Sequence, residues 1–264
     1  KKLILLFLAA PLVSIFFFSS ASFGYTAKQI SAILKLPEGE NVIIVEKKTQ
    51  TLLLICSEKN QAVVKLRIPC STGERSGKKQ ISGDKKTPEG IYFIKKEYEA
   101  KELSPIYGKK AFPLDYPNMM DKKIGNGGSA IWMHGTNKAL VPMNSNGCIV
   151  LENSHILQLK KYIKLDSTPV ILTALIEKTD KETIAGQAQD ISNMLDQFIA
   201  SISSSSYHTY LSFFSDKYLP EISWWTKWME IRKTFSDQDS VISLKRENTG
   251  IYYHNNIFVI VFDL

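Results

Sequence analysis

The sequence predicts a mainly β domain, of β-sandwich or barrel type with short helices, followed by a smaller α+β domain. Over residues 40–176, short β-rich apolar runs alternate with turn-like polar segments, which is typical of strands joined in a meander. A highly charged stretch over residues 177–186 then indicates a linker. Over residues 187–264, apolar residues recur first at helical spacing and then in strand-like runs, which favours helices packed on an antiparallel sheet.

The N-terminus has the pattern of a secretory signal peptide over residues 1–24. Lys1 and Lys2 precede an apolar run at residues 3–18, and small residues follow at 19–24. An uncleaved membrane anchor has a similar pattern, but the run is short for a span of about 20 residues, so we favour the signal. Both interpretations predict an exported protein in the periplasm or cell envelope.

The elements of the first domain follow from local pattern. A helical segment is expected over residues 25–39, because Ile30, Ile33 and Leu34 lie at helical spacing. Residues 71–90 are rich in Gly, Ser, Lys, Asp and Pro, which favours a loop. The predicted strands on either side of that loop cover residues 42–46, 51–56, 62–68 and 91–94.

Two short predicted strands carry polar residues at their ends. Residues 130–133 lead directly into His134, and the run at 147–151 has Cys148 at its start. Asn153 is a favourable N-cap for a helix that extends to residue 163. A last strand at 169–173 closes the domain. Reactive side chains on loops at strand ends are typical of a functional site.

The second domain is predicted to contain helices before strands. Its first helix is indicated by an apolar stripe at Ile191, Leu195, Phe198, Ile199 and Ile202. Two more helices are expected at 207–218 and 222–231, and strands at 241–244, 251–253 and 257–262. Because the sequence stops within a predicted strand, we expect this domain to be truncated.

Three tryptophans, Trp224, Trp225 and Trp228, lie at helical spacing in the last of these helices. Aromatic faces of this kind can line a sugar-binding pocket, but such a stripe more often packs a helix onto a sheet, and we expect packing. The remaining histidines are expected to be structural: His155, His208 and His254.

Composition limits the class of partner. Apolar residues make up 44% of the chain and charged residues 22%, as in ordinary globular proteins. The net charge of +7 suits an anionic polymer of the cell envelope. The lysines are scattered in pairs and the chain shows no nucleic-acid-binding motif, so a nucleic-acid partner is not expected.

The chain has three cysteines, an odd number for an exported protein. Cys56 and Cys70 could pair if Cys148 stays a free thiol, but both follow strand-like runs, and we favour two buried, unpaired residues. The spacing of Cys and His residues fits no zinc motif, and no metal is expected.

Cys148 and His134 are the candidate catalytic pair, and each lies next to a glycine. A thiol is nucleophilic as the thiolate, so it needs a neighbouring base, which histidine supplies near neutral pH. Gly147 permits a tight turn and close approach of a substrate. On these two residues alone, a small buried cysteine remains the more common alternative.

Several short motifs follow one another in a specific order over about residues 40 to 176. Their residues are Gly83, Asp84, Thr87, Pro88, Gly90, Tyr92, His134, Gly135, Thr136, Ser145, Gly147, Cys148 and Ile149. This order resembles the L,D-transpeptidase catalytic domain, YkuD type, of bacterial cell-wall enzymes. The segment after the linker resembles the nuclear-transport-factor-like domain of some family members, which include murein L,D-carboxypeptidases.

This resemblance implies a mainly β catalytic domain that acts on peptidoglycan stem peptides without a cofactor. It implies Cys148 as nucleophile and His134 as base and later acid. The N–H groups of Gly147 and Cys148 are candidate oxyanion donors. The Gly135 carbonyl is expected to orient the imidazole, and Ser145 to hold the cysteine loop. Thr136, Trp132 and Asn146 are candidate substrate-binding residues, although a hydroxyl such as Thr136 can also cap a turn.

Two positions depart from the family pattern. Asn146 stands where many members have histidine or lysine, and Val150 stands where many have arginine. A missing guanidinium removes a possible carboxylate contact. Together with a second domain expected to cover the cleft, this leaves two outcomes open: transfer to an amine of a second stem or a lipoprotein, or hydrolysis. An inactive wall-binding module is the third alternative, against which the intact His134 and Cys148 argue. The oligomeric state stays open.

Overall fold

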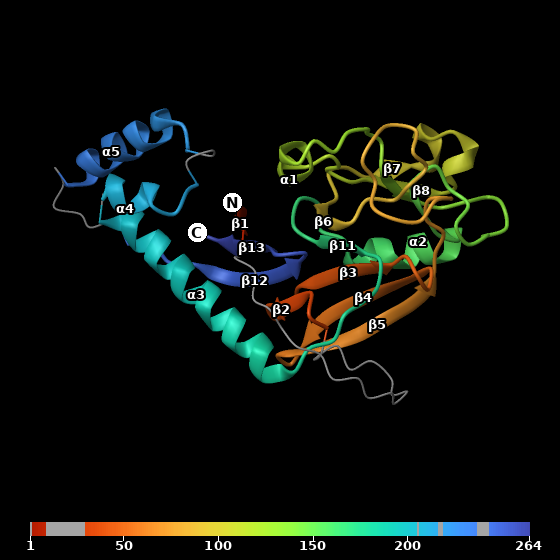
Figure 1. Cartoon of the computed structure of the whole chain (residues 1–264), viewed down its shortest axis with the longest axis horizontal. Helices are drawn as coiled ribbons and strands as arrows, with labels where there is room; N and C mark the ends of the chain where they lie inside the picture. Colours follow the sequence, from red (N-terminus) through yellow and green to blue (C-terminus); the bar gives the residue numbers. More distant parts are fainter. Residues whose placement is uncertain (1, 9–29, 205, 216–218, 237–242) are drawn as a thin grey trace.

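The structure, a computed structural model, describes residues 2–8, 30–204, 206–215, 219–236 and 243–264. These residues form three β-sheets, with most of the helical residues toward the C-terminus (Figure 1). The predicted fold class, a mainly β domain followed by helices and an antiparallel sheet, is confirmed.

The first sheet, called here the meander sheet, has the strand order β5-β4-β3-β11-β6. Strands β3, β4 and β5 pair antiparallel as predicted, whereas β11 runs parallel to β3 and antiparallel to β6. Its inner strands bury side chains on both faces, which explains their continuous apolar runs. The strands are β3 (Asn41–Glu46), β4 (Thr51–Glu58), β5 (Gln61–Pro69), β6 (Gly90–Phe93) and β11 (Pro169–Thr173).

The second sheet, the site sheet, has the order β10-β9-β8-β7. It comprises β7 (Tyr98–Glu99), β8 (Lys110–Pro113), β9 (Trp132–His134) and β10 (Ile149–Val150), with short helices η2 (Ala100–Glu102), η3 (Pro105–Tyr107), α1 (Met119–Lys123), α2 (Asn153–Leu159) and η4 (Lys160–Tyr162) around it. One apolar core joins both sheets. Its members include Ile43, Leu54 and Val170 of the meander sheet and Phe112, Met133 and Ile149 of the site sheet.

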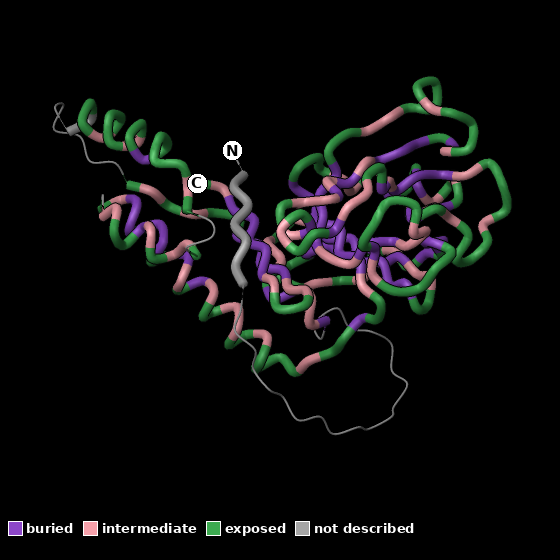
Figure 2. Tube along the Cα trace, turned by 45° about the horizontal axis from the view of Figure 1, so that its top comes forward, coloured by how far each residue is buried: buried purple, intermediate pink, exposed green. Residues whose placement is uncertain are grey.

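The third sheet, the accessory sheet, has the order β1-β13-β12-β2. Its strands are β1 (Lys2–Leu8), β2 (Ile33–Lys35), β12 (Glu247–His254) and β13 (Ile257–Asp263). Tyr252, Val259 and Val261 pack against the face of the meander sheet that points away from the site sheet. The alternate residues Ile251, Ile260 and Phe262 join a separate core with the C-terminal helices. Both faces of the hairpin β12–β13 are therefore buried (Figure 2).

The C-terminal helices are α3 (Lys181–Ser203), α4 (Tyr207–Leu211) and α5 (Ile222–Ser236). The predicted stripe of α3 is buried against the accessory sheet, as expected for an amphipathic helix. Trp225 is buried in the same core, and the indole N–H of Trp228 donates to the Ile202 carbonyl at 3.0 Å. The prediction that these two tryptophans serve packing is confirmed, while Trp224 is exposed and stacks on Tyr210.

The helical segment predicted over residues 25–39 is wrong where the structure describes it, at residues 30–39. Residues 33–35 form β2, which pairs with the edge of β12. Ile33 packs toward the meander sheet and Leu34 toward the helices, so strand alternation satisfies both apolar faces. Residues 25–29 lie outside the described part. Lys2–Leu8 form β1 on β13, while the rest of the expected signal peptide lies outside the described residues. Among the residues described, no helix has the length and apolar character needed to cross a membrane.

Four further details differ from expectation. The linker ends at residue 180 rather than 186, because Asp180 caps α3 by accepting the Thr183 N–H at 2.7 Å. The helix expected at 207–218 stops at Leu211, and residues 216–218 lie outside the description. Residues 243–244 are not a strand, and 241–242 lie outside the description. The N-cap of α2 is Glu152, not Asn153, whose side chain instead accepts the Lys109 N–H.

Candidate active site

The site is built on two adjacent parallel strands. In the pairing of β9 with β10, Val150 lies opposite His134. Cys148 directly precedes β10, and its Sγ lies 3.6 Å from the Ala130 carbonyl oxygen, just before β9 begins. The thiol therefore lies over the start of β9, and the imidazole is carried at the end of the same short strand. The two candidate residues thus lie at opposite ends of one short strand, and proton transfer between them stays a prediction.

The His134 side chain is buried and its tautomer is fixed by the backbone. Its Nδ1 lies 2.6 Å from the Gly135 carbonyl oxygen. A carbonyl can only accept, so Nδ1 carries the proton and Nε2 presents its lone pair. Burial lowers the pKa of His134, and the hydrogen bond to Gly135 only partly offsets this effect. The imidazole is consequently neutral near pH 7 and suited to act as a base.

Ser145 closes the turn that carries the cysteine. Its Oγ donates to the Cys148 carbonyl at 2.7 Å and accepts the Gly147 N–H at 3.1 Å. The Gly147 N–H, expected to be an oxyanion donor, is thus already donated within the turn. Of the two expected oxyanion donors, the Cys148 N–H therefore remains the candidate.

Burial raises the pKa of the Cys148 thiol, while the Trp132 backbone and the charge of Lys79 act in the opposite direction. Cys56 and Cys70 are buried and unpaired, as favoured from sequence, and burial raises the pKa of Cys70 to about 12. Of the three thiols, Cys148 alone is partly exposed. A partly exposed thiol over the start of β9 and a neutral imidazole at its end are the two groups that cysteine acyl-transfer chemistry needs.

Residues 40–172 match the YkuD L,D-transpeptidase catalytic domain. The chain belongs to this family. As a YkuD protein it is a peptidoglycan-modifying enzyme of the cell envelope, which confirms the resemblance drawn from the motifs. A sequence comparison with curated proteins gave no significant match.

Solved structures show that the two-domain fold of this YkuD protein is shared. Bd1075 from Bdellovibrio bacteriovorus is 25% identical with a TM-score of 0.69, over 86% of this chain and 82% of that one. The helical cell shape determining protein Pgp2 from Campylobacter jejuni is 23% identical with a TM-score of 0.57, over 88% of this chain and 90% of that one. The Pgp2 likeness shows the fold, including its C-terminal helices and antiparallel sheet.

Two glycines of the YkuD motif are required by close packing. Gly147 has a φ of +122°, and a Cβ there would lie 2.7 Å from the Lys86 carbonyl oxygen. Gly135 packs against the Asn153 side-chain oxygen, and the amide nitrogen of the same side chain donates to Asn137 in the loop after His134. Both glycines therefore set the position of the catalytic pair through the backbone rather than through a functional group.

We expect Gly147→Ala to lower kcat by at least about tenfold, because the positive φ costs roughly 1–3 kcal/mol and the new methyl displaces the Lys86 carbonyl. Steady-state turnover and thermal melting would measure the effect. Gly39→Ala is the matched control, because Gly39 also has a positive φ but has open space around it. Equal turnover in the two variants would show that the close approach is unimportant.

The candidate substrate-binding residues have different surroundings in this YkuD protein. Trp132 is half-buried and packs on Tyr98 and Tyr107, with ring centroids 5.4 Å and 5.0 Å away. Tyr107 in turn sets its edge against His134 at 5.0 Å and 84°. Trp132 therefore supports the imidazole through Tyr107, which sequence reasoning missed. A tyrosine in a loop far from the motif gives no spacing signal.

Thr136 and Asn146 are not members of the aromatic cluster around Trp132 and Tyr107. The Thr136 hydroxyl accepts the Lys138 N–H at 3.0 Å and so caps a turn. Asn146 is exposed beside Gly147 in the cysteine turn. Contact of either side chain with substrate stays a prediction.

Proposed function

We propose that this protein is a cysteine-dependent acyltransferase of L,D-transpeptidase type, which cleaves peptidoglycan stem peptides between the third residue and D-alanine. The observation that carries the proposal is the half-buried Cys148 thiol over the start of β9, the strand that ends in a neutral His134. Membership of the YkuD family supplies the substrate class. The third residue, commonly diaminopimelate, follows the family pattern.

In the proposed reaction, His134 Nε2 takes the proton of the Cys148 thiol. The thiolate attacks the carbonyl carbon of the third residue, and the Cys148 N–H donates to the oxyanion that forms. Collapse of this intermediate breaks the peptide bond, and His134 returns the proton to the leaving D-alanine amine. A thioester on Cys148 remains. An amine of a second stem or of a lipoprotein then attacks the thioester and restores the thiol.

Hydrolysis of the same thioester is the second candidate, which makes the protein an L,D-carboxypeptidase. Val150 favours it, because this position in the site offers no charge for an acceptor carboxylate. The expected covering of the cleft by the second domain does not add support. The accessory sheet packs on the meander-sheet face that points away from the site sheet.

Muropeptides analysed by mass after incubation would separate the two outcomes. We expect tetrapeptide stems to be trimmed to tripeptides at a measurable rate, because water needs no acceptor site. Cys148→Ala provides the blank. Crosslinked dimers or lipoprotein attachment, with tripeptide at the level of the blank, would leave transfer as the activity and reject hydrolysis.

A further inference from the structure

A buried ion pair lies in the loop over residues 71–90. This loop comes well before the turn that carries the nucleophile, residues 145–148, which is called here the cysteine turn. Lys79 is 3% exposed, and its Nζ donates to the Asp84 carboxylate at 2.7 Å and to the Ile81 carbonyl at 2.9 Å. A buried ammonium needs such partners, because desolvation is costly. Burial alone would raise the pKa of Asp84, but hydrogen bonds from Lys79 and three backbone N–H groups outweigh it and hold that pKa well below its usual range.

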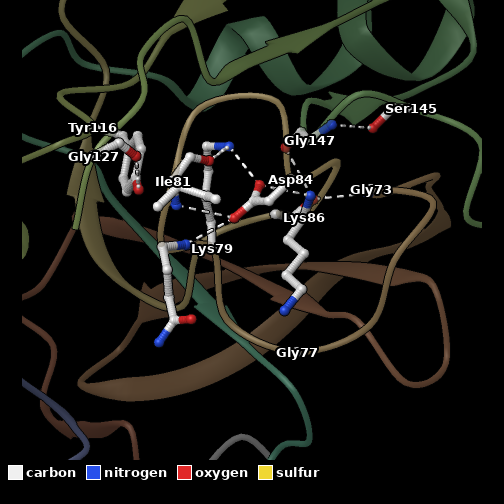
Figure 3. Close-up of polar contacts among 12 residues, drawn as sticks. Gly73, Gly77, Lys79, Ile81, Asp84, Lys86, Tyr116, Gly127, Ser145 and Gly147 are labelled. Carbon is white, nitrogen blue, oxygen red and sulfur yellow. Dashed lines mark hydrogen bonds and ion pairs between the residues drawn. The ribbon is translucent and has the colours of Figure 1, made fainter.

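Asp84 organises the whole loop around itself (Figure 3). Besides Lys79, its carboxylate accepts the N–H groups of Gln80 at 2.8 Å, Ile81 at 3.2 Å and Lys86 at 3.1 Å. One side chain thus links residues 79–81 to Lys86. The position of the Lys86 backbone depends on this carboxylate.

The same loop is the floor of the cysteine turn. The Lys86 carbonyl oxygen packs directly under Gly147. The next residue, Thr87, donates its hydroxyl to the Gly147 carbonyl at 2.9 Å and accepts the Gly73 N–H at 2.8 Å. The Lys86 carbonyl and the Thr87 hydroxyl thus both contact Gly147, the residue immediately before Cys148. A shift in the Asp84 loop therefore moves the Cys148 backbone.

The positive charge of Lys79 also acts on the Cys148 thiol. The Lys79 ammonium favours the thiolate and so opposes the effect of burial on the pKa of Cys148. Lys79 passes beside Gly128, since a Cβ on that glycine would lie 3.0 Å from Lys79 Cε. Gly128 leads into Ala130, whose carbonyl receives the thiol. The Lys79 side chain and the Cys148 thiol therefore lie along the same backbone segment, residues 128–130.

We propose that Lys79 and Asp84 are positioning residues for Cys148: the carboxylate sets the floor of the cysteine turn, and the buried Lys79 side chain lies along the backbone segment whose Ala130 carbonyl receives the thiol. The inference rests on the proposed role of Cys148 as nucleophile. It assigns a function to Asp84, a motif residue to which the reaction itself gives none.

The test measures the rate of Cys148 alkylation by iodoacetamide against pH in the full chain, with peptide mapping to confirm the residue. Lys79→Met removes the positive charge, so the midpoint of the profile should rise by roughly half a pH unit to one unit. Asp84→Asn removes the opposing charge and should move the midpoint down. Lys79→Arg keeps the charge and should retain the wild-type midpoint. Near-UV circular dichroism reports whether each variant is folded.

Lys85→Met is the matched control, because Lys85 lies in the same loop but forms an exposed pair with Glu74. Its profile should equal that of the wild type. Should Lys79→Met not fold, Lys79→Gln tests the same loss of charge and can still donate to the Ile81 carbonyl. Equal midpoints in all folded variants, or shifts of one sign for Lys79 and Asp84 variants alike, would overturn the inference. Because alkylation needs no substrate, inactivity toward muropeptides would reject the proposed function alone.

Discussion

Replacing Cys148 with alanine should lower stem-peptide turnover by at least about 1,000-fold, because no other group in the site can form the thioester. The melting temperature should change by only a few degrees, since Sγ is half-buried and its hydrogen bond to the Ala130 carbonyl is weak. Turnover of muropeptides, followed by mass, and thermal melting together measure both parts.

A covalent label provides an independent check on the same residue. A carbapenem, which acylates nucleophilic thiols of this family, should add to Cys148 in the wild type and leave Cys56 and Cys70 unmodified, because these two are buried. Cys70→Ala is a suitable control and should label as the wild type does. An adduct on either buried cysteine with Cys148 untouched would refute the assignment of the nucleophile.

Replacing His134 with glutamine should lower kcat/KM by about 100- to 10,000-fold, the usual contribution of a positioned general base. Glutamine approximates the size of the ring and can still donate to the Gly135 carbonyl, so the loss would report on proton transfer. His155→Gln is the matched control on helix α2 and should retain activity. A variant of His134 with more than a tenth of wild-type activity would assign the base elsewhere.

The pH dependence of the wild type follows from the same residue. Burial lowers the pKa of His134 from its ordinary value of 6.5, so the neutral base persists to more acidic pH than for a free histidine. The acid limb of kcat/KM should accordingly lie below pH 6.5. The stability contributed by the neutral ring is present above pH 6.5 and is lost as pH falls through the lowered pKa. An acid limb above pH 7 would contradict the burial effect.

The family, the fold class and the candidate pair Cys148 and His134 could be derived from the sequence because each leaves a local pattern. Strand ends, glycines and motif order need no knowledge of distant contacts. The strand at residues 33–35 could not be predicted in this way. Its apolar spacing fits a helix, and only pairing with β12, near the other end of the chain, makes it a strand.

The fine geometry of the site depended on side-chain directions that sequence does not give. The sequence suggested that the Gly147 N–H could donate to an oxyanion. In the structure this N–H donates to the Ser145 hydroxyl instead. The contact of the Tyr107 ring with the His134 imidazole depends on the position of η3, which the sequence does not give. The partnership of Lys79 with Asp84 likewise depends on how one loop folds back on itself.

The accessory sheet, buried on both faces, makes the two domains a single thermodynamic unit. Tyr252, Val259 and Val261 contribute to the same apolar layer as Ile44 and Ile171 of the meander sheet. Separating the domains would expose that layer to water, at about 25 cal/mol for each Å² of apolar surface. The C-terminal domain is therefore not a tethered module that samples the wall independently. Whatever it contacts is held at a fixed distance and orientation from the thiol.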